Sequence, residues 1–116
     1  MSFNTVQAFQ TTAGSRYPEG ATPVADGVNF SIYSRYATHV ELLLFEEADS
    51  PNAFQIIPLE ARLHRVFFFW SVLVLDLPVG TYYGWRIDGP DDVQQSGFRF
   101  DREKVLLHIL FLLLFL

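Results

Sequence analysis

Residues 26–34, which read DGVNFSIYS, decide the fold class of this chain. Asp-Gly is a typical turn pair, and the residues after it alternate strictly between apolar and polar side chains. Because successive side chains of a strand point to opposite faces, the apolar ones share one face: Val28, Phe30 and Ile32. The stretch is therefore predicted to be a half-buried strand opened by a turn.

Four further strands are predicted downstream at intervals of roughly ten residues. They are HVELLLFEE at 39–47, FQIIPLE at 54–60, HRVFFFWSVLVLDL at 64–77 and TYYGWRID at 81–88. Pro58 suits an edge strand, and the 64–77 strand is expected to bend near Trp70. Residues 1–26 are rich in Gly and Pro and are expected to be irregular, and 91–101 to be a loop. This pattern predicts an all-β, immunoglobulin-like antiparallel β-sandwich.

The composition narrows the function classes. Half of the 116 residues are hydrophobic and 16% are aromatic, which favours one compact domain. A net charge of −5 with scattered basic residues argues against a nucleic-acid partner. The chain has no cysteine, which excludes disulfides and thiolate metal sites. No metal or other cofactor is expected, and a start without a secretory signal pattern leads us to expect a cytoplasmic protein.

No catalytic arrangement is expected in this chain. The adjacent Asp91 and Asp92 are best explained as solvated loop residues, because neighbours in an extended segment diverge. His39, His64 and His108 stand singly, without the spacing that metal ligands need.

Exposed aromatic rings are the candidate binding groups, because sugar C–H groups pack well on aromatic faces. The candidate carbohydrate-binding residues are Tyr33, Tyr36, Trp70 and Trp85. The alternative is that such rings fill the core of the sandwich, and this is the favoured interpretation for both tryptophans, which lie in strongly apolar strands. Tyr33 and Tyr36 are expected to be exposed.

Three motifs in order resemble the N-terminal domain of bacterial glycogen-debranching enzymes of the isoamylase type. They are YPEGATPVADGVNFSIYSRYATHVELLLFEE at 17–47, LPVGTYYGWRIDGP at 77–90 and GFRFDREKVLL at 97–107. The resemblance covers about residues 14–107. It departs from the related glycogen-binding modules in that the loop at 89–97 has no tryptophan and Gly84 follows Tyr83.

The resemblance implies an early-set β-sandwich placed ahead of a catalytic (β/α)8 barrel of the α-amylase superfamily. In such enzymes the barrel hydrolyses α-1,6 branch linkages with an aspartate nucleophile and a glutamate acid, and the sandwich helps to position the glucan. This chain offers no positions for those carboxylates. We therefore expect an accessory domain for α-glucan, glycogen or starch-like, that is inactive alone. The alternatives are a stand-alone glucan-binding module, or an interaction protein that forms homo-oligomers through its apolar face and tail.

The end of the chain, HILFLLLFL at 108–116, is anomalously apolar. The resemblance predicts Asp-Pro-aromatic-Ala at this point. Residues 105–116 would reach about 18 Å as a helix, well short of the roughly 30 Å of a bilayer core. Three interpretations of the tail remain open: a membrane-associating segment, an element packed on the sandwich, and a frameshift or truncation after Leu107. The last is favoured. The expected organisation is an irregular lead-in at 1–13, the sandwich at 14–107 and an aberrant tail at 108–116.

Overall fold

The computed structural model describes residues 8–89 and the backbone of residues 105–106. The predicted loop at 91–101 and the tail at 108–116 lie outside these residues. The elements, in chain order, are β1 (Thr11–Ala13), β2 (Gly20–Val24), β3 (Gly27–Tyr33), β4 (His39–Phe45), β5 (Gln55–Leu59), α1 (Ala61–His64), β6 (Arg65–Val66), β7 (Phe69–Leu75), β8 (Tyr82–Asp88) and β9 (Val105–Leu106). In the described part of the chain, no helix is long and apolar enough to span a membrane.

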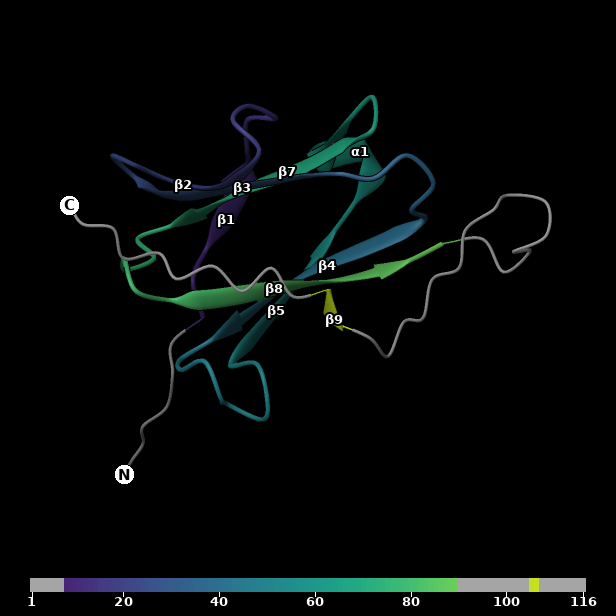
Figure 1. Ribbon diagram of the computed structural model, residues 1–116. Helices are drawn as coiled ribbons and strands as arrows, with labels where there is room; N and C mark the ends of the chain where they lie inside the picture. The colour runs from purple at the N-terminus through teal and green to yellow at the C-terminus, as the bar shows by residue number, and fades with distance from the viewer. Residues whose placement is uncertain (1–7, 90–104, 107–116) are drawn as a thin grey trace.

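Two antiparallel sheets lie face to face (Figure 1). The first sheet has the order β1-β7-β3-β2, with β6 paired to β7 beside this path. The second has the order β5-β4-β8-β9. Every pairing is antiparallel, and the prediction of an all-β, immunoglobulin-like antiparallel sandwich is confirmed.

The core lies between the two sheets and follows the alternation of the strands. In the first sheet Val28 pairs with Val74 and Phe30 with Val72, so β3 and β7 present one apolar face. In the second sheet the inward side chains include Val40, Leu42, Leu44, Tyr83, Trp85 and Ile87, all buried. The rings of Phe30 and Tyr83 meet across the interface with centroids 4.9 Å apart. The face assignments drawn from the sequence are therefore confirmed.

The two prolines that lie in strands of the described chain are both in edge strands. Pro58 lies in β5, which forms one edge of the second sheet, as its missing N–H predicts. Pro23 lies in β2, at the edge of the first sheet. A proline at an edge removes no hydrogen bond that a neighbouring strand needs.

The expectation that residues 1–26, and the lead-in at 1–13 within them, are irregular is wrong for two segments. β1 adds to the first sheet by pairing Thr11 with Val74 and Ala13 with Val72. β2 pairs along its whole length with β3. Both strands are short and lie at edges, where Gly and Pro interfere least with pairing.

The expectation of one strand over 64–77 is also wrong. Residues 61–64 form the short helix α1, and β6 and β7 then form a tight hairpin around Phe67 and Phe68. The chain therefore reverses at Phe67, which has a φ of 55°, and not near Trp70. Nothing in the local composition marks this turn, because it contains neither Gly, Pro, Asn nor Asp.

Candidate functional site

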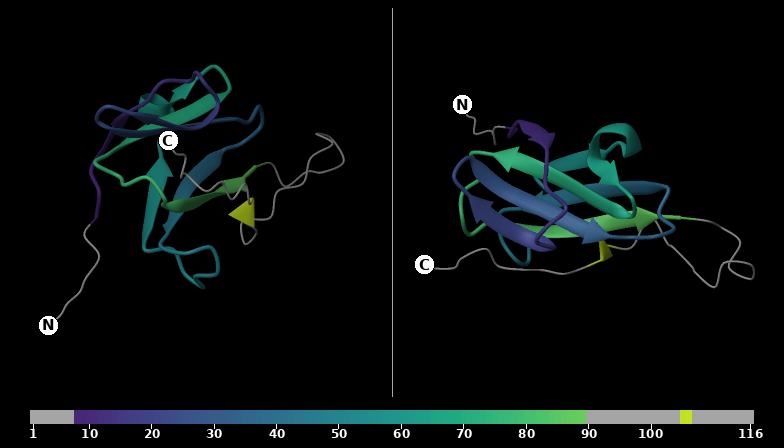
Figure 2. Two further views of the ribbon diagram at one scale, coloured as in Figure 1. Left: turned by 60° about the vertical axis from the view of Figure 1, so that its left-hand side comes forward. Right: turned by 90° about the horizontal axis from the view of Figure 1, so that it is seen from above.

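The outward face of the first sheet is crossed by residues 14–17, which run over β3 and β7 (Figure 2, right). Asn29 fixes this crossing segment: its Oδ1 accepts a hydrogen bond from the Ser15 N–H at 2.8 Å, and its Nδ2 donates to the Ser15 carbonyl at 2.8 Å. The Ser31 hydroxyl donates to the Arg16 carbonyl at 2.8 Å. Asn29 and Ser31 are consequently buried although they lie on the polar side of β3. The segment is thus held against the sheet by paired polar groups.

Gly14 permits this close approach. A Cβ at this position would lie 2.5 Å from Asn29 Oδ1 and 2.8 Å from backbone atoms of Val72. Any other residue would have to lift the segment away from the sheet. The glycine therefore places Ser15, Arg16 and Tyr17 on the outward face.

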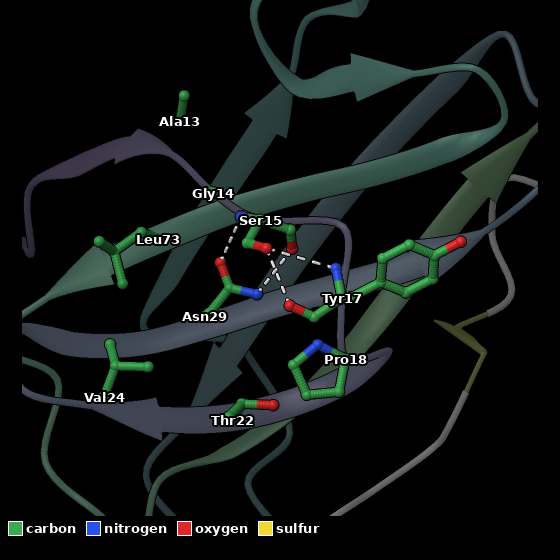
Figure 3. A pocket seen from close by; sticks show the side chains of 9 residues that line it. All are labelled: Ala13, Gly14, Ser15, Tyr17, Pro18, Thr22, Val24, Asn29 and Leu73. Carbon is green, nitrogen blue, oxygen red and sulfur yellow. Dashed lines mark hydrogen bonds between the residues drawn. The ribbon is translucent and has the colours of Figure 1, made fainter.

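An open pocket of about 340 Å³ lies between the crossing segment and the sheet (Figure 3). Its lining combines apolar and polar side chains: Ala13, Gly14, Ser15, Tyr17, Pro18, Thr22, Val24, Asn29 and Leu73. Pro18, Thr22 and Val24 form one side of it, and the hydrogen-bonded Asn29 and Ser15 lie opposite. We call this hollow the Gly14 pocket. Its size is within the range of small-ligand sites.

Aromatic side chains gather beside the pocket, where β3 ends and β7 begins. Phe69 is at the centre, with the Tyr33 ring 5.2 Å and the Tyr17 ring 5.3 Å from it between centroids. Tyr33 also meets Phe68 at 6.1 Å. Tyr17 belongs both to this group and to the pocket lining, so the two features form one continuous surface. The backbone N–H of Tyr33 donates to Glu19 Oε2 at 3.0 Å, which fixes the edge of the group.

Three guanidinium groups lie over these rings. The Arg16 Cζ is 5.1 Å from the centre of the Tyr17 ring and 5.4 Å from that of Phe67. The Arg35 Cζ is 5.4 Å from Tyr36 and 5.5 Å from Phe68. The Arg65 Cζ is 6.0 Å from the centre of the Phe68 ring and 5.8 Å from that of Trp70. We call the whole group the arginine–aromatic surface: Arg16, Tyr17, Tyr33, Arg35, Tyr36, Arg65, Phe67, Phe68 and Phe69.

Phe67 is the most exposed of the large hydrophobic residues in the described chain, with 74% of its surface accessible. Its backbone is in the left-handed region, where a non-glycine residue is strained by about 1–2 kcal/mol. The Nε–H of Arg65 donates to the Phe67 carbonyl at 2.7 Å and holds the turn. The fold thus maintains an exposed phenyl ring in an unfavourable conformation, a combination typical of binding sites.

The predicted binding residues separate into two pairs. Tyr33 and Tyr36 are 48% and 37% exposed and both belong to the arginine–aromatic surface. Trp70 and Trp85 are 1% and 2% exposed and belong to the core. Their burial on the inward faces of their strands argues against both as sugar contacts. Trp85 nevertheless lines an open hollow of about 330 Å³ together with Ser31 and Tyr83, so its candidacy stays a prediction. The favoured sequence interpretation, in which both are core residues, agrees with this placement.

Sequence reasoning missed Tyr17, the run Phe67–Phe69 and all three arginines. One signal was available: consecutive residues of a strand alternate between its two faces, so at least one of three phenylalanines in a row must point away from the core between the sheets. The stacking of the arginines depends on tertiary structure and leaves no local signal.

A carboxylate with a shifted pKa lies elsewhere, on the outward side of the second sheet. Burial raises the pKa of Glu41, but hydrogen bonds from His39 and Arg86 and their charges outweigh this effect, so the pKa is below its usual value. Arg86 Nε donates to Glu41 Oε1 at 2.8 Å across the β4–β8 pair. A general acid at neutral pH needs a raised pKa, so the lowered pKa of Glu41 argues against a proton-donating role.

Chains of known structure share this fold. The apo pullulanase of Paenibacillus barengoltzii superposes with a TM-score of 0.56 over 65% of this chain and 11% of the pullulanase chain, at 19% identity. At this identity the likeness concerns the fold alone.

Curated relatives are more similar in sequence. A chloroplastic isoamylase 3 of Oryza sativa subsp. japonica is 32% identical over 111 residues, which is 90% of this chain and 14% of the relative. A glycogen debranching enzyme of Serratia proteamaculans (strain 568) is 38% identical over 98 residues, 84% of this chain and 14% of the relative. The chain therefore spans about 14% of the length of these relatives. Residues 18–107 match carbohydrate-binding module 48, the isoamylase N-terminal domain, and the chain belongs to this family.

Proposed function

We propose that this domain binds α-glucan, of the glycogen or starch type, and positions it as an accessory part of a debranching activity in the cytoplasm. The proposal rests on one observation above all: in a domain of a carbohydrate-binding family, exposed aromatic rings adjoin an open pocket on one face. Relatives named as glycogen debranching enzyme and isoamylase support the choice of glucan.

The arginine–aromatic surface and the Gly14 pocket would bind neighbouring sugar units of one glucan chain. Tyr33 and Tyr36 offer exposed rings on which pyranose units can stack, and the Tyr33 hydroxyl can hydrogen-bond to a sugar hydroxyl. Tyr17 continues this platform to the pocket, where a neighbouring sugar unit would meet the Thr22 side chain. An extended glucan chain would thus lie along the outward face of the first sheet.

The first prediction concerns binding. The double substitution Tyr33→Ala/Tyr36→Ala is expected to weaken glycogen binding about tenfold or more, because it removes two ring faces, and buried aromatic anchors typically contribute more than 1 kcal/mol each. Affinity electrophoresis in native gels with increasing glycogen measures the effect as lost retardation.

Val79→Ala is the matched control, since Val79 is 51% exposed and lies in the β7–β8 connection at the opposite end of the strands. Wild-type protein that is not retarded by glycogen would contradict the proposed function. Equal retardation of the double variant and the wild type would show that these two tyrosines are not the sugar contacts.

The second prediction concerns hydrolysis. The isolated chain is expected to release no reducing ends from amylopectin, because it spans only about 14% of the length of its debranching relatives and because the lowered pKa of Glu41 opposes proton donation. Reducing-end assays with an intact debranching enzyme as positive control measure this. Sustained release by the pure chain would contradict an accessory role.

A further inference from the structure

Arg16, Arg35 and Arg65 concentrate positive charge on one surface of an acidic protein. The chain carries a net charge of −5, yet within residues 8–89 none of these three guanidinium groups forms a salt bridge. Arg35 and Arg65 are exposed, and Arg16 is partly exposed. The ion pairs formed in this part of the chain instead involve Glu41, on the other sheet.

The rings hold the guanidinium groups in place without neutralising them. A guanidinium over an aromatic face can still donate from the N–H groups at its rim, because stacking uses the flat side of the group. The Nε–H of Arg65 already donates to the Phe67 carbonyl, so in Arg65 the terminal N–H groups are the ones available to a ligand. Arg35 and Arg65 both have their Cζ within about 6 Å of the centre of the Phe68 ring. Two guanidinium groups thus lie around one partly buried aromatic ring.

This arrangement goes beyond what a neutral sugar requires. Neutral glucan needs ring faces and hydroxyl partners, which the tyrosines and the pocket supply. Guanidinium groups match the oxygens of a phosphate monoester in two-point hydrogen bonds, and they bind a charged acceptor roughly twice as strongly as a neutral one. A doubly charged phosphate also favours a site with more than one cation.

We propose that the arginine–aromatic surface binds α-glucan that carries phosphate monoester groups, with Arg35 and Arg65 contacting the phosphate while the neighbouring rings contact the sugar. This proposal rests on the proposed function, because it names the kind of glucan that the same surface takes. The surface would thus distinguish a phosphorylated α-glucan from an unphosphorylated one with the same sugar backbone.

The test compares chemically phosphorylated glycogen with mock-treated glycogen from the same preparation, in affinity electrophoresis at low and at moderate salt. Wild-type protein is expected to bind the phosphorylated polymer about tenfold more tightly, and salt is expected to reduce this difference. In Arg35→Ala/Arg65→Ala the ratio of the two affinities should fall to about one. The ratio is the readout because Arg65 also holds the Phe67 turn, so the double variant can lower the binding of both polymers alike.

Arg62→Ala is the matched control, since Arg62 is an exposed arginine of α1 that stacks on none of these rings. Arg62→Ala should keep the preference for phosphorylated over mock-treated glycogen. This result would distinguish a defined site from general charge attraction. Circular dichroism melting of each variant verifies that it is folded.

Equal retardation of the wild type by both polymers would overturn the phosphate proposal and leave the glucan proposal standing. The surface would then fit an acidic protein partner better. A preference lost equally in Arg62→Ala and in the double variant would overturn the assignment to Arg35 and Arg65. Retardation by neither polymer would overturn both proposals.

Discussion

Trp70→Ala is expected to lower the free energy of unfolding by about 3–5 kcal/mol, which is the usual cost of deleting a large aromatic side chain from a core. Trp70 is 1% exposed and pairs with Ile32 across β3 and β7. Because a domain of this size is typically stable by only about 5–15 kcal/mol, this loss is a large share of the total, and the variant should unfold at a clearly lower urea concentration. Urea denaturation followed by circular dichroism measures the change.

Trp70→Phe is the control that separates packing from ligand contact. In the described part of the chain nothing accepts a hydrogen bond from the indole Nε1–H, which is buried. Phenylalanine would remove that unpaired donor, and this gain of about 1–3 kcal/mol offsets part of the lost volume. We expect Trp70→Phe to stay folded and to bind glycogen like the wild type. Loss of glycogen binding by this folded variant would contradict the placement of Trp70 outside the site.

The strand faces could be predicted from the sequence because alternation is a local property. Val28, Phe30 and Ile32 point inward by their spacing alone, and the same holds for Tyr83, Trp85 and Ile87 in β8. Pro58 could be assigned to an edge because its missing N–H excludes it from a central position. Each of these assignments needed only the residue and its immediate neighbours.

The candidate site could be predicted only in part, because it is assembled by long-range contacts. Asn29 has the spacing of an exposed residue but is buried by Ser15, which lies 14 residues away in sequence. The turn at Phe67 contains only residues that favour strands, so local propensity extends the strand through it. Tyr33 and Tyr36 were identifiable by their position on the polar side of a strand and in the turn after it. Their arginine neighbours were not, since stacking is decided by the packed fold.

Phe67→Asn is expected to leave the domain as stable as the wild type or about 1 kcal/mol more stable. Asparagine adopts the left-handed conformation more readily than phenylalanine, so the strain at φ 55° is relieved. The 74% exposed ring contributes little burial that could be lost. Thermal melting should therefore show an unchanged or higher midpoint.

The same substitution is expected to weaken glycogen binding about tenfold, because it removes the most exposed ring of the arginine–aromatic surface and the partner on which Arg16 stacks. Unchanged or higher stability together with weaker binding indicates a residue that serves ligand binding, since replacing a structural residue would lower the stability of the protein. Leu63→Asn is the control: Leu63 is a 62% exposed apolar residue of α1 outside the arginine–aromatic surface, so its replacement should leave binding unchanged. A Phe67→Asn variant that melts earlier and binds glycogen normally would show that the exposed ring serves the fold instead.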